Sequence, residues 1–495
     1  MHQRHLIRWV GKSRASSALV LAATMVVFAA GPSPATTSRP ELPPKIKESE
    51  ARSPGFRPPS PTRVRASVAE STRLGFCGGD DWEPEITADA FGHVYVVWPH
   101  FPGDPTCDPA SGNPRDVYIQ VSGDGGETFG PPQIVVDVPY PNVVDTVVTT
   151  NESGVVYVSF IAYGHDNRDI DVIVARSTDF GASFTWTKVN GPECTVCDHP
   201  WIAASGSNVY VTYASGKNHY LSRSSDGGLT WAETNVLKAG SVAFPEGGVI
   251  DSSGNAWFAW GDCNGSCSGK TAAVYRVSRT LAGTSTTTFA DIASAPAGPD
   301  CPYPGACGFA YFGPQNDIAI DAAGNLYMVW QDGQVHSKPK SPPIVQLSSC
   351  PADRNCARSS NWTYVGRADD KTSSGCAGSA CYALFPRVEG GAAGEIGVIW
   401  MDDRNGAPLD HKNGWNVWYR SSTTGGTSWT GPSIRVSTFD PSREESESHG
   451  FRFPYGDYHG IDITPGGNTV MIWGEGIDYV GGPEKPGHIV YGLLA

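Results

Sequence analysis

The sequence predicts an all-β fold, a single β-propeller with seven four-stranded blades, or with six blades as the alternative. Three observations support this prediction. The 495 residues include 58 Gly, 39 Pro, 15 Trp and 19 Tyr, and only 17% are charged, which is typical of many short strands joined by turns. A hairpin pattern recurs along the chain, and several later strands end in one short turn motif.

Residues 1–35 have the features of a signal peptide. Four basic residues among the first 14 precede an apolar run over 18–30, and Ser33, Pro34 and Ala35 have the small-x-small pattern of a cleavage site. The apolar run is too short to cross a bilayer core of about 30 Å as a helix. We therefore expect a soluble, secreted, extracellular product without membrane insertion.

The segment 36–72 is expected to be a disordered, proline-rich linker. It is rich in Pro, Ser and charged residues with almost no aromatic side chains, so it cannot bury enough apolar surface to fold. A strand from roughly 60 to 76 is expected to pair with the last unit, which ends at 488–494, and to close the ring. The propeller is assigned to residues 73–495.

The chain is acidic, with a formal net charge of −14 despite its basic leader. An acidic protein repels phosphate backbones, which argues against a nucleic-acid partner. The segment 194–199 lacks the second cysteine pair of a structural zinc site, and no helix pattern follows the glycine-containing segment 265–271. We therefore expect no metal and no cofactor.

The cysteines predict disulfides. An even number of cysteines in an exported chain favours disulfides over free thiols or metal binding. The 12 cysteines fall into six pairs of sequence neighbours, which we expect to form local bridges: Cys77 with Cys107, Cys194 with Cys197, Cys263 with Cys267, Cys301 with Cys307, Cys350 with Cys356, and Cys376 with Cys381.

The blades are predicted from seven hairpins that share one pattern. Each has an apolar strand, a polar turn that usually carries Gly, and a strand with alternating apolar and aromatic residues. The ranges are 86–98, 147–160, 201–213, 249–260, 318–330, 388–400 and 461–473. Enough chain separates consecutive hairpins for two further strands, which makes four-stranded units.

The strands that follow several hairpins end in Ser-x-Asp-x-Gly-x-Thr/Ser-Trp/Phe. Good copies carry Asp124, Asp179 and Asp226, and a fourth copy over 422–429 has Thr424 in the aspartate position. In such a turn the carboxylate accepts backbone N–H groups and the glycine takes a conformation closed to other residues. The motif resembles the Asp-box, or BNR repeat, of the sialidase superfamily. In that family the box is structural and lies away from the active centre.

The resemblance implies an axial site with three arginines that hold a substrate carboxylate, an aspartate acid/base, and a tyrosine nucleophile paired with a glutamate. The Arg-Ile-Pro type motif on the family's first inner strand has no counterpart at 82–86, where Trp-Glu-Pro-Glu-Ile stands. Sialidases of this superfamily have six blades.

Candidate site residues lie in the segments that precede the hairpins, because propeller ligands bind where loops enter the innermost strands. The segment 450–462 is the first choice, since it is dense in groups that hydrogen-bond to sugars and stack on them. The alternative for the arginines is an ion pair with a nearby carboxylate. The catalytic candidates are Glu246, Asp457 and Tyr458, and the ligand-binding candidates are Arg387, Arg404, Arg452, Tyr455 and His459.

Together these observations predict a secreted, sialidase-like propeller that acts on glycans. The leading hypothesis is a glycoside hydrolase, of the exo-sialidase-like type if it is an enzyme, with an axial site for an acidic or complex polysaccharide. The second hypothesis is a non-catalytic carbohydrate-binding or adhesion propeller, and the third is a polysaccharide lyase. An enzyme needs a close pair of carboxylates or a Tyr-Glu pair on the axis, whereas a binder needs only aromatic surfaces and polar rims.

Overall fold

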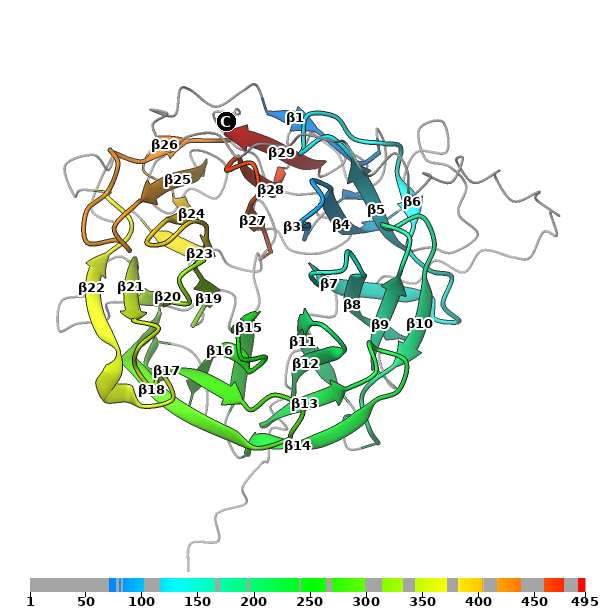
Figure 1. Cartoon of the computed structure of the whole chain (residues 1–495), viewed down its shortest axis with the longest axis horizontal. Helices are drawn as coiled ribbons and strands as arrows, with labels where there is room; N and C mark the ends of the chain where they lie inside the picture. The colour runs from blue at the N-terminus through cyan, green and yellow to red at the C-terminus, as the bar shows by residue number, and fades with distance from the viewer. Residues whose placement is uncertain are drawn as a thin grey trace, which may run out of the picture.

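The computed structural model shows a seven-bladed propeller of antiparallel sheets, as the sequence predicts (Figure 1). In the described residues the one helical element is a 3-10 turn, η1 (Ser359–Asn361), and no helix is long and apolar enough to cross a membrane. The described residues are 71–76, 80–81, 83–101, 116–164, 170–192, 194, 196–239, 242–263, 269–298, 314–332, 343–371, 382–402, 404, 416–437, 458–475 and 488–494.

Each blade begins with an inner strand next to the axis and continues with a second strand. The inner strands are β3 (Glu85–Ala88), β7 (Asn142–Thr150), β11 (Cys197–Ser205), β15 (Val242–Ile250), β19 (Asn316–Ile320), β23 (Ala383–Gly390) and β27 (Gly460–Ile463). The second strands are β4 (Val94–Phe101), β8 (Val156–Tyr163), β12 (Asn208–Ser215), β16 (Ala256–Cys263), β20 (Leu326–Asp332), β24 (Ile396–Asp402) and β28 (Thr469–Glu475). All seven predicted hairpins are therefore confirmed.

The third and fourth strands complete each blade toward the rim. The third strands are β5 (Asp116–Ser122), β9 (Asp171–Ser177), β13 (Asn218–Ser224), β17 (Gly269–Thr280), β21 (Ile344–Cys350), β25 (Asn416–Ser422) and β29 (His488–Leu494). The fourth strands are β6 (Gln133–Ile134), β10 (Thr185–Lys188), β14 (Ala232–Ala239), β18 (Thr287–Gly298), β22 (Thr363–Arg367), β26 (Ile434–Arg435) and β1 (Thr72–Arg73). A short strand, β2 (Asp80–Asp81), also pairs with β4 in the first blade.

The ring is closed by strands from both ends of the chain. The short strand β1 pairs antiparallel with β29, with Thr72 opposite Tyr491 and Arg73 opposite Val490. Together they cover the outer edge of the seventh blade, an edge that would otherwise be free to pair with another chain. The predicted closure is confirmed for the described part of the expected strand.

The turns between inner and second strands share one geometry in four blades. The side-chain oxygen at the first turn position accepts the N–H groups of the second and fourth residues after it. In the first blade, Asp89 Oδ1 lies 2.8 Å from the nitrogens of both Phe91 and His93. Gly92 between them has φ 94°, which requires glycine. The same arrangement recurs at Asn151, Asp251 and Asp321.

The turns after β5, β9 and β13 have almost identical hydrogen bonds. In the first, the Ser122 hydroxyl donates to Asp124 Oδ1 at 2.7 Å, and the Thr128 N–H donates to the same oxygen at 2.9 Å. Asp179 and Asp226 occupy the same position in the second and third turns. In the fourth turn Thr424 replaces the aspartate, and its hydroxyl accepts the Ser428 N–H at 2.9 Å. These local contacts connect the two ends of each turn.

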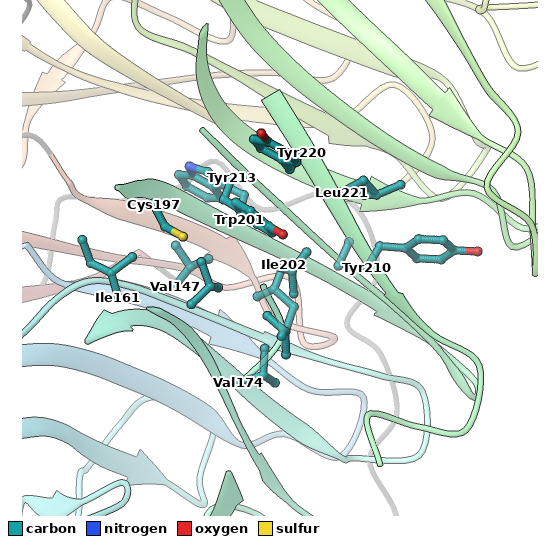
Figure 2. Packing of buried hydrophobic residues seen from close by; sticks show 14 of the residues in the cluster. Val147, Ile161, Val174, Cys197, Trp201, Ile202, Tyr210, Tyr213, Tyr220 and Leu221 are labelled. Carbon is teal, nitrogen blue, oxygen red and sulfur yellow. The ribbon is translucent and has the colours of Figure 1, made fainter. Parts of the chain in front are cut away.

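The apolar core lies between the faces of neighbouring blades. Side chains of β7 to β9 pack against those of β11 to β13, where Val147, Ile161 and Val174 meet Trp201 and Ile202 (Figure 2). Similar clusters of buried side chains join the other blades. Because each blade is covered on both faces, its second strand is buried along its whole length, as in β4, β8 and β16.

Two of the predicted disulfides are confirmed. Cys194 bonds to Cys197 and Cys350 to Cys356, with Cα–Cα distances of 5.6 and 5.9 Å. Cys263 is also disulfide-bonded, and no described cysteine is free. The remaining cysteines lie outside the described residues: Cys77, Cys107, Cys267, Cys301, Cys307, Cys376 and Cys381.

Candidate functional site

The backbone is kinked at the axial edge of five blades. Glu83 (47°), Asp145 (57°), His199 (50°) and Phe385 (52°) have positive φ there, as does Gly247 (76°). The register of pairing between the inner and second strands shifts at four of these positions. They are Asp145, His199, Gly247 and Phe385. A positive φ is uncommon for residues other than glycine, and such conformations cluster at binding and catalytic sites. This edge is therefore the first place to look for a site.

The axis has two chemically different ends. Four of the five kinks lie before an inner strand or in its first half, whereas Gly247 is the sixth residue of β15. We call this end of the inner strands the kinked end. The hairpin turns follow the last residues of the inner strands, at the opposite end of the axis. Successive strands of a blade are antiparallel, so the turns after the third strands β5, β9 and β13 lie at this opposite end as well. We call it the turn end. Of the ligand-binding candidates from the sequence, Arg387 and His459 lie at the kinked end.

Arg387 joins four blades at the kinked end. Its side chain is almost fully buried, and its Nη1 donates to Glu246 Oε2 at 3.0 Å and to the Asn316 carbonyl at 3.2 Å. Its Nε donates to the His459 carbonyl at 3.1 Å. Burial acts against the guanidinium charge, but the carboxylates of Glu246, Asp317 and Glu85 prevail and raise its pKa. Arg387 therefore stays charged and fixes the fourth, fifth and seventh blades relative to the sixth.

Tyr458 and His199 form a hydrogen-bonded pair next to this arginine. The Tyr458 hydroxyl lies 2.9 Å from His199 Nδ1, and the two rings are stacked. Tyr458 also stacks on Trp201, whose ring centroid is 4.9 Å from the Arg387 guanidinium carbon. The His199 N–H donates to Asp145 Oδ2 at 3.2 Å. A hydroxyl, an imidazole and a guanidinium from three blades thus meet in one buried cluster.

Glu246 brings a carboxyl group with an unusual pKa to the cluster. Burial raises its pKa to about 7, although the charges of Arg387 and His199 act to lower it. Its Oε2 also accepts the Asn316 N–H at 3.0 Å. A carboxyl whose pKa lies near neutrality can both donate and accept a proton under physiological conditions, which is the property of a general acid or base.

Other acids on the inner strands connect neighbouring blades. An inner strand is a sheet edge, so some of its N–H groups have no partner within the blade. Carboxylates of the preceding blade accept several of them. These pairs are Asp145 with the N–H of His199, Glu246 with that of Asn316, Asp317 with that of Val388, and Asp462 with that of Ala88. Part of the acidity of the axis therefore has a structural cause.

The structure brings together four of the eight catalytic and ligand-binding candidates. Glu246, Tyr458, Arg387 and His459 meet at the kinked end, where burial and Arg387 lower the pKa of His459 well below its usual value. Arg404 lies elsewhere in the sixth blade, where it pairs with Asp402 and Asp370 and stacks on Trp418. The candidates Arg452, Tyr455 and Asp457 lie outside the described residues.

The sequence places His199 in a segment before the third hairpin, but neither it nor Trp201 or Asp145 was selected as a candidate. His199 and Asp145 are two of the residues with positive φ, and Trp201 lies two positions after His199. A local signal existed: Pro follows the kink residue in Glu-Pro-Glu at 83–85, His-Pro-Trp at 199–201 and Phe-Pro-Arg at 385–387. In each case the residue after Pro lines the axis. Alignment of the seven inner-strand sequences with one another shows this proline pattern in three of them.

Comparisons with known proteins do not identify the family of this chain. No family model and no curated protein matches the sequence. Among solved structures, a Dyadobacter fermentans protein of unknown function has a TM-score of 0.47 and 11% identity over 88% of this chain and 98% of its own. An ulvan lyase has a TM-score of 0.46 and 10% sequence identity, over 84% of this chain and 95% of its own. The intramolecular trans-sialidase of Ruminococcus gnavus has a TM-score of 0.42 and 12% sequence identity, over 86% of this chain and 96% of its own. At these values the similarity concerns the arrangement of strands alone.

Proposed function

We propose that the chain is a secreted, sialidase-like propeller that acts on glycans at the kinked end of its axis. The observation that carries the proposal is the Tyr458 hydroxyl on His199 Nδ1, next to a buried Arg387–Glu246 ion pair. These groups come from the third, fourth, sixth and seventh blades, so the closed ring is needed to assemble them. Strained backbone at His199 and Phe385 supports the same location.

The leading activity is glycoside hydrolysis. The Tyr458 oxygen attacks the anomeric carbon while His199 takes the hydroxyl proton, and the bond to the leaving sugar breaks. Glu246, with a pKa of about 7, supplies a proton to the leaving oxygen. Asp457, next to Tyr458 in the chain, is an alternative acid/base in the pattern that the Asp-box resemblance implies. Water then attacks the glycosyl-tyrosine bond: Glu246 takes a proton from the water, and His199 returns its proton to the Tyr458 oxygen as that bond breaks.

Arg387 serves this site as a positioning residue. Its Nη1 and Nε already bind Glu246, Asn316 and His459, so a sugar carboxylate would have to displace one of them. Arg452, Tyr455 and the ring of His459 are the proposed ligand contacts at the axis. Arg404, which belongs to another part of the sixth blade, would contact a more distant portion of a long chain.

A specific observation favours the second candidate, a non-catalytic glycan-binding propeller. Tyr458 is only 1% exposed and Glu246 is equally buried, so a substrate reaches them only after neighbouring chain moves aside. A binder needs no such movement, because polar and aromatic groups around the axis can hold a glycan without access to these two side chains. The two candidates differ in whether a bond is cleaved.

A polysaccharide panel separates the candidates. The purified protein is incubated with sialylated, uronate-containing and neutral glycans, and new reducing ends, free sialic acid, unsaturated uronate and retention on immobilised glycan are measured. Release that falls at least ~100-fold in Glu246→Gln supports the hydrolase. Unsaturated product indicates a lyase, and retention without release indicates a binder. Absence of all four signals for every class contradicts a glycan-directed function. Asp353→Asn, which removes an exposed carboxylate, is the matched control.

Export can be tested separately. Two disulfides in the described residues are typical of proteins from an oxidising compartment. The mature protein recovered from the medium of its host is expected to begin after Ala35 and to contain no free thiol. Intact mass spectrometry before and after reduction measures both properties. An unprocessed N-terminus in the cell, with thiols that react before reduction, would contradict the assignment.

A further inference from the structure

A disulfide lies directly before the site residue His199 in the chain. It joins Cys194 to Cys197, the first residue of β11, and His199 is the third residue of that strand. Both cysteines are buried, at 5% and 1% exposure. They belong to the same cluster of buried side chains as Trp201 and Tyr458 (Figure 2). The disulfide is therefore part of the buried surroundings of the proposed site.

His199 occupies an irregular position in β11. Cys197 and Asp198 pair with β12, the register then shifts, and regular pairing resumes at Trp201. His199 lies within the shift and has φ 50°, a value that is uncommon for residues other than glycine. Five pairs, from Trp201 to Ser205, support this bulge on its C-terminal side, but only two pairs precede it. Pairs at the end of a strand open easily, so the bulge needs a further constraint on that side.

The register shifts of other blades are supported differently on the same side. In the second blade three pairs precede the shift, and Asn142 Nδ2 donates to the Gly164 carbonyl at 3.3 Å. In the fourth blade five pairs precede it. In the sixth blade two pairs precede it, and the Ala383 N–H donates to the Pro343 carbonyl at 3.0 Å. In the described part of the third blade, the disulfide at Cys197 occupies the corresponding place.

The connection from β10 to β11 crosses the kinked end from the rim to the axis. Near the rim it is fixed by Asn190, whose Oδ1 accepts an N–H of β9 at 2.8 Å. Closer to the axis, Val196 forms a bridge to Ile170 of the second blade. The disulfide closes the last part of the connection, directly before the strand. The crosslink therefore limits the positions from which β11 can begin.

We propose that the Cys194–Cys197 disulfide positions His199 for its hydrogen bond to Tyr458. By fixing the first residues of β11, it keeps the bulge in register, so that His199 Nδ1 stays 2.9 Å from the Tyr458 hydroxyl. A displacement of about 1 Å at a reacting group can cost roughly 100-fold in rate. The cysteines act through His199 and are therefore positioning residues. The effect on catalysis rests on the proposed function, whereas the position of the imidazole can be measured without it.

The second described disulfide provides a matched control. Cys350 and Cys356 are also buried and close a similarly short loop, with a separation of six positions instead of three. Loss of either bridge should therefore have a comparable effect on the entropy of the unfolded chain. Cys350 lies opposite Leu326 at the turn end, in a buried cluster that does not include Trp201 or Tyr458. Removal of this bridge should leave the imidazole in place.

Nitrogen NMR of histidine-labelled protein tests the position of His199 directly. Its signals are assigned by their absence in His199→Asn, and Tyr458→Phe shows where they lie without the hydrogen bond. In Cys194→Ala with Cys197→Ala, we expect the Nδ1 signal to move toward its position in Tyr458→Phe. In the matching double alanine variant of the control bridge, it should keep the wild-type position.

Circular dichroism verifies that each variant is folded. If the variant without the Cys194–Cys197 bridge does not fold, the folded wild type is treated with a phosphine reductant and its free thiols are alkylated. Mass spectrometry then identifies the bridge that has opened, and the same NMR spectrum is recorded.

Activity supplies the second measurement. On the best glycan of the panel, kcat per folded molecule should fall at least ~10-fold without the Cys194–Cys197 bridge, with little change in KM, and stay within about twofold without the control bridge. A moved Nδ1 signal with unchanged kcat would confirm the positioning and contradict His199 as the catalytic base. If the wild type releases no product, the hydrolase proposal fails, and the NMR comparison still decides the role of the disulfide.

Two results would overturn the proposal. One is an unchanged Nδ1 signal in folded protein that lacks the Cys194–Cys197 bridge. The other is an equal displacement of this signal when the control bridge is removed, which would indicate a general loosening of the ring instead of local positioning. Neither result depends on whether the protein acts on glycans.

Discussion

The two ends of the axis are built in opposite ways. At the turn end, Asp124 receives all its hydrogen bonds from residues within four positions in the chain, and the same pattern recurs at Asp179 and Asp226. At the kinked end, Arg387 binds groups 71 to 141 positions away. Local contacts can form before the ring closes, whereas the contacts of Arg387 exist only in the closed ring.

Burial adds a second contrast. The turn-end aspartates are solvated, so each hydrogen bond replaces one with water and contributes little net free energy. At the kinked end Arg387 is 2% exposed and Glu246 is similarly buried. Removal of one partner there leaves a buried charge without compensation. We therefore expect substitutions at the kinked end to have larger effects on stability, and to be the ones that change function.

The largest effect is expected for Arg387→Met. The methionine fills most of the volume but leaves the Glu246 carboxylate, the Asn316 carbonyl and the His459 carbonyl without their donor. Loss of one partner of a buried pair costs about 3–5 kcal/mol of unfolding free energy. Chemical denaturation measures the change, with the exposed Arg354→Met as control.

The double variant Arg387→Met with Glu246→Gln sharpens this prediction. If the cost comes from the unpaired carboxylate, the double variant should be more stable than Arg387→Met alone, with a coupling free energy of about 1–3 kcal/mol. Additive effects would mean that the two residues do not interact, against the 3.0 Å ion pair.

The pH dependence of stability should also separate the two ends. The pKa of Glu246 is raised to about 7 by burial in the folded protein, so the folded state holds a proton that the unfolded state releases near the usual value of 4.5. Its contribution to stability is fully present below pH 4.5 and is lost as the pH rises through about 7. Glu246→Gln should flatten the curve of unfolding free energy between pH 5 and 8, by at most about 3 kcal/mol. A curve identical to that of the wild type would refute the assignment.

A turn-end variant should cost less. In Asp124→Ala the Thr128 N–H and two hydroxyl groups lose their acceptor. Because water can replace the carboxylate there, we expect a loss of about 1–2 kcal/mol. Hydrogen bonds from Ser122 and Thr128 hold the pKa of Asp124 below its usual value despite partial burial, so this contribution should fade at low pH. Thermal unfolding at neutral and acidic pH provides the comparison.

The contrast also explains what could be predicted from the sequence. The hairpins, the Asp-box turns and the pairs Cys194–Cys197 and Cys350–Cys356 depend on neighbours in the chain, so local patterns revealed them. Glu246 and Arg387 were found as candidates from their place before the hairpins. Their partnership was not predicted, because 141 positions separate them and only the ring geometry brings them together.

The smallest effect is expected from repair of the incomplete fourth box. Thr424 accepts the Ser428 N–H through its hydroxyl, and this turn otherwise keeps the geometry of the others. Thr424→Asp would supply a charged acceptor for both the N–H and the hydroxyl of Ser428. We expect a gain of roughly 0.5–1 kcal/mol in unfolding free energy. A loss of stability would show that the aspartate is not what stabilises the other three turns.

If the kinked end acts on glycans while the turn end is scaffold, variants of the two ends should separate activity from the turn contacts, and one paired measurement tests this most directly. Activity toward the best glycan from the panel is measured per folded molecule for Tyr458→Phe and Asp124→Ala. We expect a loss of at least ~100-fold for folded Tyr458→Phe, with a lower melting temperature because a buried hydrogen bond to His199 is lost, and full activity for Asp124→Ala with a smaller fall in melting temperature. Full activity in folded Tyr458→Phe, together with a loss in Asp124→Ala, would contradict it.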